Sequence, residues 1–126
     1  MDVLSAPGAP AAVGPYSHAV RVGGLLFCSG QVALDPEAGT LVGDEVAAQT
    51  EQVFKNIRAV LAAAGADLRD VVKTTVFLDT MDDFQAMNGV YAEAFGDHRP
   101  ARSTVAVDRL PVGALVEIEV IAEIAS

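Results

Sequence analysis

A strict two-residue alternation near the end of the chain constrains the fold more than any other feature. The apolar set of alternate side chains is Val116, Ile118, Val120, Ala122 and Ile124. The positions between them carry Glu117, Glu119, Ile121 and Glu123. Because successive side chains of a strand point to opposite faces of a sheet, the pattern predicts a strand buried on one face and polar on the other.

Helical spacing of apolar residues appears twice earlier in the chain. We expect Asp44 to cap a first helix that runs to about Ala64, with Gly65 ending it. Its apolar stripe consists of Val46, Val53, Ile57, Val60 and Leu61. Residues 80–83 resemble a capped helix start, and a second helix is expected to continue from Phe84 and to stop by Gly96.

The remaining apolar runs read as strands. Residues 16–22 and 25–29 are predicted to form a hairpin that turns at Gly23-Gly24. Further strands are expected over 71–78, 103–107 and 116–124, whereas the segment up to Pro15 reads as an irregular arm. This order predicts an α+β fold, a mixed β-sheet with two helices packed on one face.

Length and composition fit one small domain over residues 1–126. The chain has 126 residues, of which 52% are hydrophobic. One ordinary core is feasible at this size. The apolar fraction is high for so small a chain, so we expect part of the apolar surface to be buried between subunits.

The charge balance argues against two classes of partner. The chain has 8 Lys and Arg against 17 Asp and Glu, a net charge of −9. Nucleic-acid binding needs clustered cations to neutralise phosphates, and an anionic membrane surface would repel this chain. No apolar run approaches the roughly 20 residues of a membrane span, and no basic secretory leader is visible. We therefore expect a cytoplasmic protein with neither nucleic acid nor membrane as a partner.

Signatures of metal, nucleotide and triad chemistry are missing from the sequence. His18 and His98 lie far apart, and Cys28 is the single cysteine, so a zinc site is not expected. Neither a GxGxxG nor a GxxxxGK[ST] motif occurs, and no serine stands in a clear pattern with a histidine and an acid.

One arginine stands among apolar neighbours at the start of a strand. Arg102 and Thr104 share one face of the strand that precedes the alternating segment. Pairing the polar faces of these two strands would place both residues on a common surface with one or two of the glutamates of the alternating segment. Arg102 then has two interpretations. It forms a cross-strand pair with a glutamate, which contributes little when exposed, or it clamps an anion in a bidentate fork.

Seven segments of the chain, in order and with similar spacing, resemble the Rid family of reactive-intermediate deaminases, also called the YjgF family. They are residues 14–20 (GPYSHAV), 29–31 (SGQ), 49–52 (QTEQ), 71–78 (VVKTTVFL), 87–91 (MNGVY), 100–103 (PARS) and 116–119 (VEIE). The resemblance implies an architecture like trimeric chorismate mutase, a homotrimer with sites between adjacent subunits. It also implies hydrolysis of reactive 2-imino and 2-enamino acids, such as 2-aminoacrylate, 2-iminopropanoate and 2-iminobutanoate, to 2-oxo acids and ammonia. The resemblance further implies a role in the control of metabolite damage, through a reaction that uses neither a cofactor nor a metal.

The resemblance also assigns roles by position. Arg102 matches the arginine that holds the substrate carboxylate, and Glu117 matches the glutamate beside the attacking water. The pocket positions correspond to Tyr16, Ser29, Gly30, Asn88 and Thr104.

Three positions depart from the family pattern. Thr104 stands where many active members have cysteine, Asp108 stands where a small residue is common, and His18 replaces a frequent glutamine. Other functions therefore stay open: a non-catalytic regulatory or stress module that binds small ligands with the same fold, and a catabolic deaminase for a larger enamine. RNA cleavage is opposed by the net charge of −9.

Overall fold

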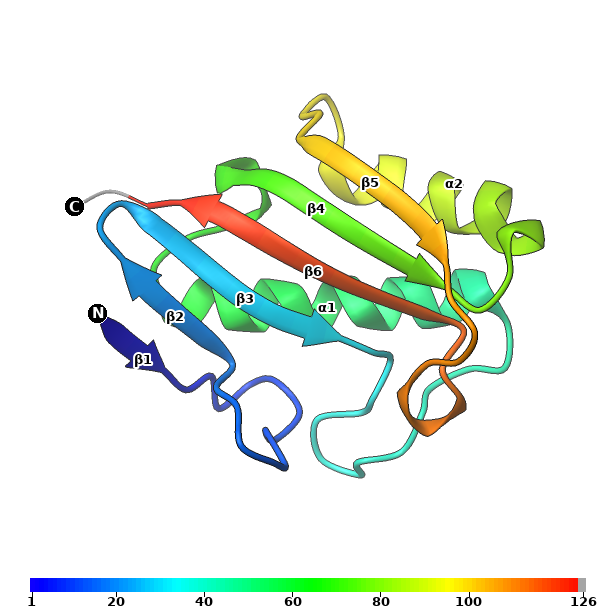
Figure 1. Cartoon of the computed structure of the whole chain (residues 1–126), viewed down its shortest axis with the longest axis horizontal. Coiled ribbons are helices and arrows are strands. Elements are labelled where there is room, and N and C mark those ends of the chain that lie inside the picture. The colour runs from blue at the N-terminus through cyan, green and yellow to red at the C-terminus, as the bar shows by residue number, and fades with distance from the viewer. Residues whose placement is uncertain (125–126) are drawn as a thin grey trace.

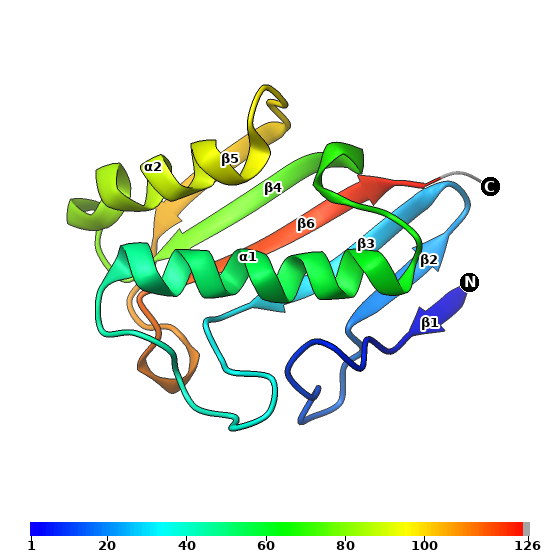
Figure 2. The same cartoon turned by 180° about the vertical axis from the view of Figure 1, so that it is seen from behind.

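The computed structural model describes residues 1–124 and forms one six-stranded sheet with two helices on one face (Figures 1 and 2). The strands are β1 (Asp2–Leu4), β2 (Ala19–Val22), β3 (Leu25–Gln31), β4 (Val71–Leu78), β5 (Ala101–Ala106) and β6 (Val116–Glu123). The helices are α1 (Val46–Ala63) and α2 (Phe84–Phe95), with short 3-10 turns η1 (Leu68–Asp70), η2 (Met81–Asp83) and η3 (Pro111–Gly113). The predicted α+β class and the placement of both helices on one face are confirmed.

The sheet has the order β1-β2-β3-β6-β4-β5, and its neighbours are antiparallel except for the parallel pair β4–β5. The strand β6 therefore lies inside the sheet between β3 and β4 (Figure 1). The chain crosses from β4 to β5 through α2, as a parallel connection requires.

The core lies between β6 and the helices. Along β6 the alternate side chains Val116, Ile118, Val120 and Ala122 are at most 2% exposed, as the alternation predicts. The helices cover them with fully or nearly fully buried side chains, among them Val53, Phe54, Ile57, Leu61, Met87, Tyr91 and Phe95. The rings of Tyr91 and Phe95 each meet Phe54 edge-on, at centroid distances of 5.7 and 5.5 Å.

The predicted cap of α1 is wrong. The residue before the helix is Glu45, not Asp44, and its side chain makes no capping hydrogen bond. Instead the buried Gln49 side chain fixes this region: its Nε2 donates to the Gly43 carbonyl at 3.1 Å, and its Oε1 accepts from the Leu115 backbone N–H at 2.9 Å. Both predicted helix ends are confirmed, since Gly65 and Gly96 follow the helices with φ of 73° and 63°.

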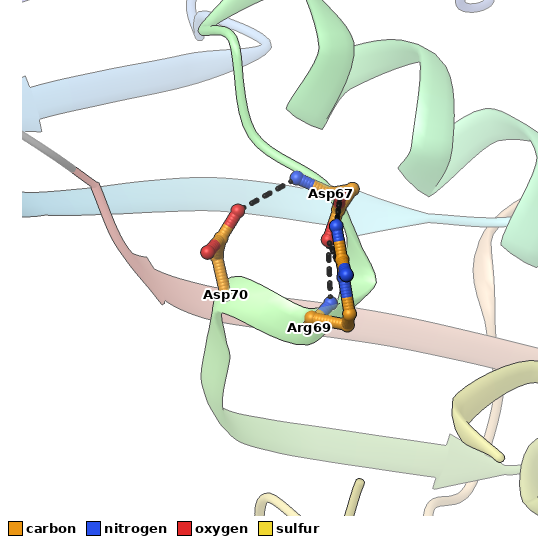
Figure 3. Close-up of polar contacts among 3 residues, drawn as sticks. All are labelled: Asp67, Arg69 and Asp70. Carbon is orange, nitrogen blue, oxygen red and sulfur yellow. Dashed lines mark hydrogen bonds and ion pairs between the residues drawn. The ribbon is translucent and has the colours of Figure 1, made fainter.

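The turn η1 leads from α1 into β4 and is closed by a small charged cluster (Figure 3). Asp67 accepts from the backbone N–H of Arg69 at 2.9 Å and pairs with its guanidinium at 3.0 Å, while Asp70 accepts from the backbone N–H of Asp67 at 2.9 Å. The Arg69 hydrogen bonds lower the pKa of the Asp67 carboxyl. All three groups take part in capping an exposed turn, so the cluster has a structural role.

The N-terminal segment is more ordered than expected. Asp2–Leu4 pairs with β2 as β1, so the prediction of an irregular arm up to Pro15 is wrong for these residues. The strand β2 begins at Ala19 rather than Tyr16, because the preceding His18 ring anchors the arm. Its Nδ1 accepts from the Ala6 backbone N–H at 2.8 Å, and its Nε2 donates to the Pro10 carbonyl at 2.7 Å. This explains the buried histidine without any role in metal binding.

Candidate functional site

The two residues expected to carry the chemistry lie on opposite faces of the sheet in one chain. The expectation of a common surface assumed that β5 pairs with β6, but β4 lies between them (Figure 1). Across these strands Arg102 is in register with Thr74 and Val120 on the helix-covered face, whereas Glu117 is in register with Phe77 on the open face. The expected common surface is therefore wrong within a single chain, and the candidate residues form two groups.

The first group, here called the arginine half-site, is built by β5 and one face of α2. Arg102 is half-buried, and its Nη1 donates to Asn88 Oδ1 at 2.7 Å. Its guanidinium carbon lies 4.7 Å from the ring centroid of Tyr91 and 5.5 Å from that of Phe84. Positions 84, 88 and 91 share a helix face, so α2 presents two rings and one amide to the same guanidinium.

The arginine half-site leaves most of the guanidinium donors available. A guanidinium has five N–H donors, and Asn88 accepts one hydrogen bond from Arg102. No carboxylate within residues 1–124 forms an ion pair with Arg102, so the cross-strand pairing with a glutamate is not formed. The side chain is held in place by neutral partners, and its charge can still bind an anion.

Thr104 extends the arginine half-site along β5. It lies two residues beyond Arg102 and therefore on the same face of the strand. Its Oγ1 is buried, and no group among residues 1–124 hydrogen-bonds to it. Buried hydroxyls are nearly always hydrogen-bonded, so this one is a candidate for contact with a ligand.

The second group, the glutamate half-site, surrounds a cavity of about 540 Å³ beside the open face. The cavity is lined by Val13, Tyr16, Ser29, Gly30, Val32, Leu34, Pro111, Val112, Glu117 and Glu119. Four of the predicted site residues thus lie together, from three separate parts of the chain.

A break in the β3–β6 ladder creates the space for Glu117. The pairing register shifts between Cys28 and Gln31, so Ser29 and Gly30 leave the regular ladder. A Cβ added to Gly30 would lie 2.6 Å from Glu117 Oε2, so the Glu117 side chain would have to move to accommodate any other residue. Ser29 holds the bulge to the preceding strand, since its Oγ donates to the Ser17 carbonyl at 2.6 Å.

Burial tunes the acidity of the glutamate half-site. Half-burial of Glu117 raises the pKa of its carboxyl above the usual value, and the neighbouring charge of Glu119 raises it further. A carboxylate with a raised pKa is a stronger base than an exposed one, so Glu117 is suited to take a proton from water.

Three other possibilities concern a thiolate nucleophile, a metal site and a membrane span. Burial raises the pKa of the Cys28 thiol to about 12, so it is not a thiolate nucleophile at neutral pH. Among the residues described, no three His, Cys, Asp or Glu side chains gather in a way that could hold a metal ion. None of the helices in residues 1–124 is long and apolar enough to cross a membrane.

Sequence reasoning missed several members of both half-sites. Phe84 and Tyr91 were not singled out as site residues, although their spacing with Asn88 could have shown that they share a helix face with it. Val13 and Val112 carried no signal at all, because they come together with Glu117 only through the fold.

Comparisons with known proteins cover almost the whole chain. A family model described as Endoribonuclease L-PSP matches residues 6–124. A RutC family protein of Pyrococcus horikoshii is 50% identical over 121 residues, which are 96% of each chain. The mouse 2-iminobutanoate/2-iminopropanoate deaminase is 48% identical over 120 residues, 95% of this chain and 89% of the mouse protein. The crystal structure of RidA from an Antarctic Psychrobacter superposes with a TM-score of 0.94 at 45% identity, covering 98% of this chain and 100% of the other.

Proposed function

The chain belongs to the Endoribonuclease L-PSP family, which is the Rid or YjgF family, and from this premise we propose that it is a cofactor-independent deaminase of 2-imino and 2-enamino acids. The reaction would convert substrates such as 2-iminopropanoate and 2-iminobutanoate to 2-oxo acids and ammonia. The observation that carries the proposal is Arg102, which neutral partners hold in place while its charge has no carboxylate partner within residues 1–124.

We propose further that each site forms between two copies of the chain, in a homotrimer. Arg102 and Glu117 face opposite sides of one sheet, so a single chain cannot bring them to one small substrate. The open face also carries exposed apolar side chains, including Phe27 at 42% and Val105 at 45%. Apolar side chains exposed on a sheet are typical of a surface that another chain covers.

Binding begins at the arginine half-site. The Arg102 guanidinium takes the substrate carboxylate in a two-point contact, which fixes both the position and the orientation of the adjacent C2 atom. The Thr104 hydroxyl, on the same face of β5, donates a further hydrogen bond to the bound molecule.

Hydrolysis takes place at C2, next to the glutamate half-site of the neighbouring copy. Glu117 accepts a proton from a water molecule as the water oxygen bonds to C2, and this proton passes to the imine nitrogen, which becomes an amine. Glu117 then takes the proton of the new hydroxyl group and passes it to the amine, the C2–N bond breaks, ammonia leaves, and the oxygen becomes the carbonyl of the 2-oxo acid. An imine carbon is already electrophilic, so positioning and proton transfer supply what the reaction needs.

RNA cleavage, which the family description suggests, fits this chain less well. Binding of RNA requires cationic side chains that neutralise phosphates, and the chain carries 8 Lys and Arg against 17 Asp and Glu. We therefore place deamination first.

A trapping assay tests the proposal. An amino-acid oxidase generates the imino acid in the presence of semicarbazide, which converts surviving imine to a measurable adduct. We expect the wild-type protein to lower the rate of adduct formation and Arg102→Ala to lose this activity by about 100-fold or more, because the carboxylate is no longer oriented. Arg58→Ala, which removes an exposed arginine from α1, is the matched control and should behave like wild type.

The outcome also separates the other functions. If wild-type protein and Arg102→Ala leave the adduct unchanged for short and branched substrates, imine deamination is wrong for them. Binding of 2-oxobutanoate that depends on Arg102 would then favour a ligand-binding module, and turnover of a larger enamine would favour a catabolic deaminase.

A further inference from the structure

The cavity of the glutamate half-site has an apolar rim. Three of the large apolar side chains exposed on the chain line it: Val13 is 80% exposed, Tyr16 51% and Val112 65%. Val32 and Leu34 add two half-buried apolar side chains to the lining. Exposed apolar groups that gather around one cavity indicate a surface that binds an apolar group.

Val112 reaches this rim at a conformational cost. Its φ of 53° and ψ of 22° lie in the left-handed region, and it is the one residue other than glycine in the described part of the chain with a positive φ. A β-branched side chain is poorly tolerated there, whereas glycine or asparagine is accommodated readily. Because Val112 is mostly exposed in the single chain, packing within that chain does not offset the strain, and strained residues of this kind cluster at binding sites.

The cavity offers more room than a short substrate needs. In the proposed reaction C2 lies beside Glu117, the carboxylate faces Arg102 of the other copy, and the nitrogen leaves as ammonia. The remaining substituent on C2 is the substrate side chain. Since Val112 and Glu117 line the same cavity of about 540 Å³, this substituent has an apolar wall within reach.

We propose that Val112, together with Val13 and Tyr16, forms a subsite for the substrate side chain and sets a preference for 2-imino acids with a four-carbon aliphatic side chain. The inference rests on the proposed deaminase function and names its substrate class. The imino acid of leucine, 2-imino-4-methylpentanoate, would then be a better substrate than 2-iminopropanoate, whose methyl group cannot reach the rim.

The test compares kcat/KM for these two imino acids, each generated by an amino-acid oxidase and followed with semicarbazide. We expect the wild-type ratio to favour 2-imino-4-methylpentanoate by about tenfold or more, since each methylene in an apolar pocket contributes to discrimination. Val112→Asn introduces a polar side chain that the left-handed backbone accommodates readily. This variant should lower the ratio at least about fivefold. Val22→Asn, at a valine 48% exposed at the β2–β3 hairpin, is the matched control and should leave the ratio unchanged.

A binding measurement keeps the inference testable apart from catalysis. Calorimetry compares the two product 2-oxo acids, 4-methyl-2-oxopentanoate and pyruvate, with wild type and both variants. If turnover is absent but the larger product binds more tightly in a Val112-dependent way, the subsite stands and the deaminase proposal fails. The proposed subsite is overturned if the wild-type kcat/KM ratio of 2-imino-4-methylpentanoate to 2-iminopropanoate is one or less, or if Val112→Asn does not change this ratio. It is also overturned if turnover is absent and neither product binds.

Discussion

Glu117 is placed where both burial and a neighbouring like charge oppose its ionisation. The Gly30 backbone packs against its carboxyl group, and Glu119 follows two residues later on the same face of β6. Both effects raise the pKa of Glu117, burial more than charge. The Glu117 carboxylate is therefore a stronger base than the carboxylate of an exposed glutamate. Its ionised form, however, contributes less to the stability of the fold than its protonated form does.

The pH dependence of activity should report the raised pKa of Glu117. A base must be ionised to act, so kcat should fall on acidification with a midpoint above 4.5, the ordinary value for this carboxyl. Glu119→Gln removes the like charge and should move that midpoint to lower pH with activity retained. The pH profile of the semicarbazide assay measures both midpoints, and a wild-type midpoint at or below 4.5 would contradict the role of Glu117.

The same group makes an opposite prediction for stability. Because the pKa of Glu117 is higher in the folded than in the unfolded chain, its stabilising contribution is present below about pH 4.5 and is lost as the pH rises through the folded value. Glu117→Gln should therefore raise Tm at pH 7 and leave it nearly unchanged at pH 4, while turnover is lost. Thermal unfolding at the two pH values checks this, and an equal or lower Tm at pH 7 would show that the ionised carboxylate is well accommodated.

The residues of the site were predictable only in part. Arg102, Asn88, Thr104, Glu117, Tyr16, Ser29 and Gly30 were named in advance. The strand pattern alone pointed to Arg102, to Thr104 and to one or two glutamates of the last strand, and the other assignments depended on a family resemblance. Val112 was missed because a left-handed valine leaves no local signal. The close approach of the Gly30 backbone to the Glu117 carboxyl is likewise a product of the fold, which a sequence does not show.

Among the elements, α1 has a direct connection to the glutamate half-site. The side chain of Asn56, only 1% exposed, donates from Nδ2 to the carbonyls of Val32 at 3.1 Å and Leu34 at 2.9 Å. Val32 and Leu34 both line the cavity beside Glu117. One buried amide on the helix thus holds the segment that follows β3 in place.

Asn56→Asp should loosen that segment. Aspartate has nearly the same shape but cannot donate while ionised, so two buried carbonyls would face a carboxylate without a proton between them. We expect a loss of about 2–4 kcal/mol in the free energy of unfolding, together with a raised KM. Denaturant unfolding and the semicarbazide assay measure the two effects.

Gln52→Ala is the control for this prediction. Gln52 is half-buried on the same helix and donates to Asn56 Oδ1 at 3.0 Å without touching either carbonyl. Its replacement should cost less than about 1 kcal/mol, the usual contribution of a single hydrogen bond. Equal losses in the two variants would mean that the helix face as a whole, rather than the amide of Asn56, supports the segment.

Helices and strands with a clear apolar period were predictable from the sequence, whereas the order of the strands in the sheet was not. The apolar stripe of α1 and the alternation of β6 are local, so their residues could be assigned without tertiary information. The strands β5 and β6 are consecutive in the chain and were assumed to pair, yet β4 takes the place between them. The order of strands is decided by hydrogen-bonded pairing between segments that lie far apart in the chain. Pairing with β2 also makes Asp2–Leu4 a strand.

At the scale of the whole molecule, the strand order has a consequence for assembly. With β4 inserted, Arg102 lies beneath α2 while Glu117 lies on the uncovered side of the sheet. Side-chain movement cannot carry the Arg102 guanidinium or the Glu117 carboxyl through the hydrogen-bonded sheet to the other face. A site that uses both groups must therefore take them from different copies of the chain. In a closed ring, each copy gives its arginine half-site to one neighbour and its glutamate half-site to the other.

Mixed assemblies make this geometry measurable. Arg102→Ala and Glu117→Gln are each expected to be inactive alone, because every interface lacks one of the two groups. When the two variants are co-expressed with different tags and purified as mixed trimers, some interfaces combine an intact Arg102 with an intact Glu117. A mixed ring of three contains one such interface out of three, so the purified mixture should recover about one third of wild-type activity.

The matched control combines Arg102→Ala with the double variant Arg102→Ala, Glu117→Gln. That mixture contains no intact Arg102 and should stay inactive, which separates restored sites from a general effect of co-assembly. Mixed trimers of the two single variants that remain as inactive as either alone would mean that the residues do not meet across an interface. Since the sheet separates them within one chain, such a result would overturn the proposal of a site shared between two copies.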